Sequence, residues 1–191
     1  MVKRVLLAAL CSAVLMFLWG FLFWGLLNMG SLLMQPLPAE LDVLASLRGS
    51  QAPSGMYVYP APQGMNDAEK MEEFTRQHRE GPLLQLAYRA EGSEPMPPAV
   101  LALGFGHYFV VALLTATMVA CGGKGLTCFL SRFMSVMTMV VAATIWANAG
   151  DAIWWFHSPR YCLGNSIYQL VAGALMAAVV AAVVKPQGTA E

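Results

Sequence analysis

Residues 5–27 read VLLAALCSAVLMFLWGFLFWGLL, a run of 23 residues without a charged side chain. An α-helix rises about 1.5 Å per residue, so about 20 apolar residues suffice to cross the roughly 30 Å hydrocarbon core of a membrane. The run therefore predicts one membrane-spanning helix. Lys3 and Arg4 stand directly before it, and a more polar stretch of the chain follows it.

Three further apolar runs of similar length lie at 99–121, 133–153 and 163–184, and their one charged residue is Asp151 near the end of the second. The composition agrees, because 58% of the residues are hydrophobic and 12% are charged, against roughly 45–50% and about 25% in soluble domains. The sequence thus predicts a mainly α membrane protein with four transmembrane helices. The formal net charge is zero, which gives no support for nucleic-acid binding.

A cleaved signal peptide is the alternative for the first run. Its 23 apolar residues exceed the roughly 7 to 15 of a signal peptide, and no Ala-x-Ala cleavage site follows. The stretch from Leu7 to Cys11 has the outline of a lipoprotein cleavage box, but Leu10 occupies the place of the required small residue. We therefore expect an uncleaved anchor.

Lysine and arginine residues predict the orientation. Lys3, Arg4, Lys124, Arg132 and Lys185 all lie on one side if the chain crosses four times, and positive residues mark the cytoplasmic side. Both termini are then cytoplasmic. The expected order is a cytoplasmic N-terminus with helix 1 (1–27), a periplasmic insertion (28–98), helix 2 (99–121), a cytoplasmic loop (122–132), helix 3 (133–153), a periplasmic link (154–162), helix 4 (163–184) and a cytoplasmic tail (185–191).

The insertion at 28–98 carries 14 of the 22 charged residues, nine acidic and five basic, so its net charge is −4. Apolar spacing and capping residues predict short helices at 38–47 and 66–78, the second with an Asn66 cap. Runs of aromatic and aliphatic residues predict strands at 56–59 and 83–88. Two strands alone are marginally stable, so we expect this small α/β domain to pack against the membrane helices or against a partner protein.

Polar residues inside the apolar runs are the candidate site. Counted from the middle of each run, His107, Asn148 and Gln169 lie roughly 5 to 8 Å to the outer side of the bilayer centre. Asp151 and Asn165 lie one helical turn nearer the outer surface. Because polar groups in hydrocarbon usually point into the helix bundle, we predict one inward-facing cluster. Its five members are His107, Asn148, Asp151, Asn165 and Gln169.

Two interpretations of this cluster stay open. It could hold the helices together through hydrogen bonds, or it could bind a small ligand or quinone or relay protons. A haem with two histidine ligands is not favoured, because only His107 lies deep inside a predicted membrane span. A copper site on the outer face would use methionines, but these show no repeated ligand spacing, and the four cysteines suggest neither a disulfide framework nor a metal site. We therefore predict no metal and no cofactor.

Small residues recur every four positions in the fourth run, at Gly173, Ala177 and Ala181. Such a face lets another helix approach closely. The neighbour could be the first or third helix, or a helix of another subunit.

No catalytic motif is present in the sequence, which favours a protein that is not an enzyme. With many packing surfaces and no chemistry of its own, the chain is expected to be an accessory or structural subunit of a larger membrane complex. Its expected partners are the lipid bilayer and other proteins. The rival hypothesis is a membrane protein that binds a small ligand, a quinone or copper at the polar cluster.

Three stretches carry a resemblance: Phe17–Phe21 (FLWGF), Ser54–Pro60 (SGMYVYP) and the end of the chain from Ile153 to Pro186. Through these stretches the chain resembles a group of small uncharacterised bacterial inner-membrane proteins with four transmembrane helices. The resemblance implies a bacterial inner membrane and assigns no functional residue.

Overall fold

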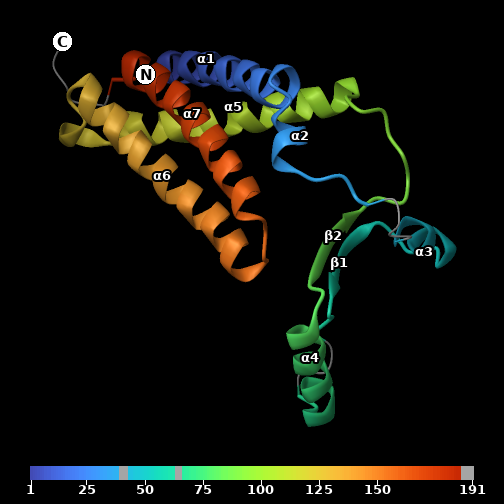
Figure 1. Cartoon of the computed structure of the whole chain (residues 1–191). Helices are drawn as coiled ribbons and strands as arrows, with labels where there is room; N and C mark the ends of the chain where they lie inside the picture. Colours follow the sequence, from blue (N-terminus) through green and yellow to red (C-terminus); the bar gives the residue numbers. More distant parts are fainter. Residues whose placement is uncertain (39–42, 63–65, 186–191) are drawn as a thin grey trace. The chain divides into compact units, whose positions relative to one another are not determined.

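The computed structural model describes residues 1–38, 43–62 and 66–185, which form two compact units. The helical unit comprises residues 1–35 and 96–191, and the inserted unit comprises residues 36–95. The elements in chain order are α1 (Val2–Gly20), α2 (Met29–Leu33), α3 (Val43–Gly49), β1 (Gly55–Tyr59), α4 (Ala68–Glu80), β2 (Leu84–Tyr88), α5 (Pro98–Cys121), α6 (Phe129–Trp154) and α7 (Pro159–Val183) (Figure 1).

Four helices are long and apolar enough to cross a membrane: α1 with its continuation to Leu26, α5, α6 and α7. The continuation of α1, Phe21–Leu26, is a π-helix, a wider turn that is rare in proteins. The prediction of four spanning helices and a small two-stranded sheet is confirmed at this level. The chain is a multi-pass membrane protein by the length and composition of these helices.

Two of the spans begin four residues earlier than predicted. α6 starts at Phe129, because Cys128 caps it: the Ser131 backbone N–H donates to Cys128 Sγ at 3.4 Å. α7 starts at Pro159, a residue suited to the first turn of a helix. As a result Arg132 lies inside α6, and Cys162 lies buried inside α7 rather than in a loop.

Packing in the helical unit runs in the order α5, α1, α7, α6, with α1 against α5 and α6 against α7 as the closest pairs (Figure 1). Small side chains fill the contact between α1 and α5, which lets the two backbones approach. They are Ala8, Ala9, Ser12 and Ala13 on α1, and Ala112, Thr115, Ala116 and Ala120 on α5. Helices α5 and α6 barely touch, so each has one face outside the bundle.

The small-residue face of the fourth span is buried within the chain. Gly173, Ala177 and Ala181 are buried on α7, and a Cβ atom added to Gly173 would lie 2.3 Å from a methyl carbon of Val140 on α6. The neighbour is therefore the third span, which was one of the three predicted possibilities.

Gly173→Ala is expected to destabilise the protein by about 1–3 kcal/mol, because the added methyl overlaps Val140 and pushes α6 from α7. The measurement is the unfolding midpoint in detergent. The matched control is Gly150→Ala on α6, where an added Cβ meets no atom within 4 Å. The control should unfold at the original midpoint or slightly above it, since alanine favours helix. Equal losses in both variants would contradict the close-contact explanation.

The inserted unit consists of a two-stranded antiparallel ribbon, β1 with β2, and two helices. The strands agree with the predicted ranges. The predicted helix 38–47 is seen as α3 from Val43, its residues 39–42 lying outside the described chain. The helix predicted at 66–78 is α4, and its cap is Asp67 rather than Asn66, because the Asp67 carboxylate accepts from the N–H groups of Glu69 and Lys70.

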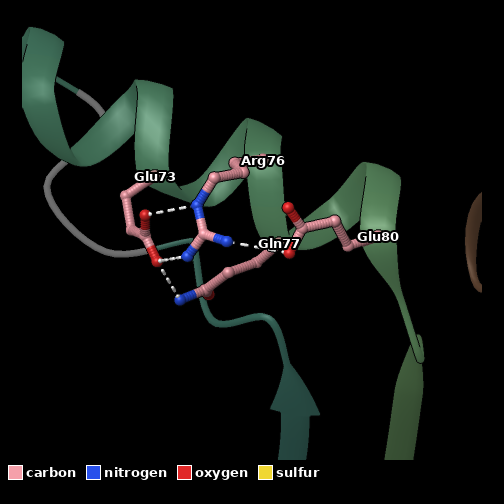
Figure 2. A network of polar contacts seen from close by, with 4 residues as sticks. All are labelled: Glu73, Arg76, Gln77 and Glu80. Carbon is pink, nitrogen blue, oxygen red and sulfur yellow. Dashed lines mark hydrogen bonds and ion pairs between the residues drawn. The ribbon is translucent and has the colours of Figure 1, made fainter.

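Charged residues on α4 form one network on its surface (Figure 2). The Arg76 guanidinium donates two hydrogen bonds to Glu73, at 2.6 and 2.9 Å, and one to Glu80 at 2.8 Å. Gln77 donates to Glu73 at 2.6 Å, and these bonds, above all those from Arg76, lower the pKa of the Glu73 carboxyl. The network supports a helix that has no buried residue of its own.

Candidate functional site

Three of the five predicted polar residues form one hydrogen-bonded group between α6 and α7. Asn148 is 4% exposed and lies at its centre. Its Nδ2 donates to Gln169 Oε1 at 2.8 Å and to the Thr144 carbonyl at 3.0 Å, while its Oδ1 accepts from Asn165 Nδ2 at 2.8 Å. Each side-chain group of Asn148 is therefore satisfied by the protein itself, as expected of a contact that holds helices together.

The other two residues form no hydrogen bond with this group in the described part of the chain, so the predicted five-residue cluster is reduced to three bonded amides. His107 is exposed on α5, where its ring contacts the neighbouring Tyr108. Asp151 is half-buried, and its Oδ2 lies 3.8 Å from His157 Nδ1. The sequence position of a residue gives its depth in the membrane but not the direction in which its side chain points around the helix axis. Helix α5 packs on α1, and His107 lies on the exposed side of α5.

A cluster of aromatic side chains joins α7 to the two other spans, α1 and α5, next to the level of the amide group. The hydroxyl groups of Tyr108 on α5 and Tyr168 on α7 are hydrogen-bonded, and Trp19 Nε1 on α1 donates to the Tyr168 carbonyl at 3.0 Å. Gly20 makes room for this contact, since a Cβ there would lie 3.1 Å from the Tyr168 hydroxyl. This contact was not predicted from the sequence, because neither tyrosine was among the five candidate residues.

Arg132 is the polar residue that sequence reasoning misplaced. It was expected to mark the cytoplasmic edge, yet it is 8% exposed. Its Nε donates to the Ala181 carbonyl at 2.8 Å, and its Nη1 donates to the Leu126 and Thr127 carbonyls at 3.2 and 3.1 Å. Arg132 thus caps the C-terminal end of α7 and fixes the loop before α6, using carbonyls that have no helical partner.

One side of the ribbon in the inserted unit consists of aromatic and aliphatic side chains. Side chains paired across two strands share a face, and the pairs Tyr57 with Leu86, Tyr59 with Leu84, and Gly55 with Tyr88 place five large side chains together. We call Tyr57, Tyr59, Leu84, Leu86 and Tyr88 the ribbon face. Tyr59 and Leu84 are each 44% exposed, whereas Tyr57, Leu86 and Tyr88 are half-buried, so the exposed part of the ribbon face lies at Tyr59 and Leu84.

The described residues contain no group of three or more His, Cys, Asp or Glu side chains arranged to hold a metal ion. The four cysteines are free thiols, and hydrogen bonds from Ser131 lower the pKa of Cys128. A shallow hollow of about 450 Å³ lies beside α4, lined by Ala61, Asp67, Glu69, Lys70, Glu73, Phe74 and Gln77. Its charged groups bond mainly within α4, so it offers no site of its own.

No protein family, curated protein or solved structure matches the chain. The fold and its polar contacts define a class: a multi-pass helical membrane protein whose intramembrane polar groups mostly bind one another.

Proposed function

We propose that the chain is a non-catalytic accessory or structural subunit of a larger complex in a bacterial inner membrane. The observation that carries this proposal is the ribbon face, where the facing side chains of Tyr59 and Leu84 are each 44% exposed. A two-stranded ribbon is marginal alone, and exposed apolar patches of this kind are typical of protein contacts. In this proposal a partner protein binds the ribbon face and shields it from water.

Charge supports a particular kind of partner. With both termini in the cytoplasm, the inserted unit is periplasmic, and it carries nine acidic and five basic residues. This net charge of −4 favours a partner with a basic surface around an apolar patch, since complementary potentials speed association and select partners.

The test is purification of the full chain from its native membranes in mild detergent. The unaltered chain should bring down one protein partner in constant stoichiometry. The variant Tyr59→Ser/Leu84→Ser removes two facing members of the ribbon face, each 44% exposed, and should reduce that recovery at least tenfold. The matched control is Val58→Ser on the opposite side of the same strand, which is 46% exposed and should keep the partner.

Two results would contradict the proposal. One is a solitary protein in every preparation, and the other is equal recovery of the partner by both variants. Metal analysis and an absorbance spectrum of the same sample test the rival ligand-binding function directly, because a bound chromophore or copper in constant ratio would favour it.

A further inference from the structure

Helix α5 exposes one continuous stripe of side chains along its whole length. Its members are Val100, Leu103, His107, Val110, Leu114, Thr117 and Cys121, and every one of them is exposed. They follow one another at alternating steps of three and four residues, the spacing of the contact positions in parallel helix pairs. The stripe, which we call the α5 seam, lies opposite the residues of α5 that pack on α1.

His107 is out of place on a surface that meets only lipid. Its imidazole lies near the middle of a spanning helix, and the described residues give it a ring contact with Tyr108 but no hydrogen bond. The hydroxyl group of the seam residue Thr117 is satisfied, because its Oγ1 donates to the Leu113 carbonyl at 2.7 Å. Histidine in hydrocarbon normally faces protein, so a partner from outside this chain is expected at His107.

We propose that the α5 seam is a dimer contact occupied by the α5 seam of a second copy of this chain. Two copies inserted in the same direction are related by a two-fold axis along the membrane normal, so their α5 helices run parallel. Equivalent residues then lie at the same depth, and His107 meets His107 of the other copy. A neutral imidazole has one donor and one acceptor nitrogen, so the two rings satisfy one another with a hydrogen bond.

The remaining seam residues suit the same occupant. The seam contains no charged residue, so two identical copies do not repel one another there. A single polar residue at such a contact position can fix the register of two paired helices. In the proposed dimer His107 is this residue. This inference concerns the helical unit alone, so it stands or falls separately from docking at the ribbon face.

Cysteine cross-linking of the full chain in native membranes tests the contact. Cys121 already belongs to the seam, and it becomes the only cysteine after Cys11→Ser, Cys128→Ser and Cys162→Ala. Copper-phenanthroline oxidation should then join two copies into a product of twice the chain mass. In a chain without native cysteines, Leu114→Cys should cross-link equally well, whereas Leu113→Cys, one residue away and off the seam, should not.

Variants of His107 test the hydrogen bond itself. His107→Leu should weaken dimerisation roughly 3- to 30-fold, the range expected for one hydrogen bond between membrane helices. His107→Asn keeps a donor and an acceptor and should restore the dimer. Because His107 is exposed, both variants should unfold at the same midpoint as the unaltered monomer.

Three results would overturn the inference. They are equal cross-linking at Leu113→Cys and Leu114→Cys, no cross-linking at Cys121 or Leu114→Cys, and a cross-linked product whose mass shows another protein in place of the second copy. Equal dimerisation by His107→Leu and the unaltered chain would remove the role of the imidazole pair, and with it the proposal.

Discussion

Arg132→Met is expected to lower the free energy of unfolding by about 2–4 kcal/mol. The variant deletes three hydrogen bonds from a charged group, each typically contributing about 1.5–3 kcal/mol. It also leaves the Ala181 carbonyl at the end of α7 without a donor. Part of the loss is offset, because methionine removes a buried charge. The measurement is the unfolding midpoint in mixed detergent micelles.

Arg160→Met is the matched control for the arginine variant. Arg160 stands in the first turn of α7 and is exposed, so the same chemical change there should shift the midpoint very little. Arg132→Lys should fall between the two, because an ammonium group cannot reproduce the fork that reaches the α7 end and the loop together. If the two methionine variants unfold alike, Arg132 does not cap α7.

The number of spanning helices was predictable from the sequence, because a helix that crosses a membrane needs a minimum length of consecutive apolar residues. An uncharged run of sufficient length is enough to identify a span. The errors at the starts of α6 and α7 came from using Arg132 and Arg160 as boundaries, although both lie inside the helices. An arginine usually marks the membrane surface, and only the carbonyls of Leu126, Thr127 and Ala181 make its burial within α6 favourable.

The candidate site was predicted in part, for a similar reason. Depth along each run brought Asn148, Asn165 and Gln169 to one height, and the structure joins them. The rotation of each helix depends on which neighbour it packs against, which a single sequence does not encode locally. Once α5 packs on α1 through its alanine face, His107 must point away from the amide group.

The two strands of the ribbon could be predicted from their composition, but the residues of the ribbon face and their exposure could not. Alternation along β1 and β2 indicates that Tyr57 and Tyr59 share a side, while the register that adds Leu84 and Leu86 to that side is a property of the pairing. How far each residue of the ribbon face is exposed depends on the tertiary structure around it, which leaves Tyr59 and Leu84 each 44% exposed.

Asn148→Leu is expected to destabilise the protein by about 2–4 kcal/mol. The substitution removes the bonds to Gln169 and Asn165 and leaves both amides unpaired in an apolar contact. The double variant Asn148→Leu/Gln169→Leu should lose less than the sum of the two single variants, since removing both partners leaves fewer unpaired groups. Unfolding midpoints of the four proteins give this coupling.

The same series distinguishes a contact between helices from a binding site. Replacing Asn148, Asn165 and Gln169 together by leucine removes every amide of the group, so stability should largely return, as it does when buried polar groups are exchanged for apolar ones of similar volume. If the group only joins α6 to α7, this triple variant should also keep its protein partner. A stable triple variant that loses a bound ligand or its partner would contradict that explanation and make the amide group the site of recognition.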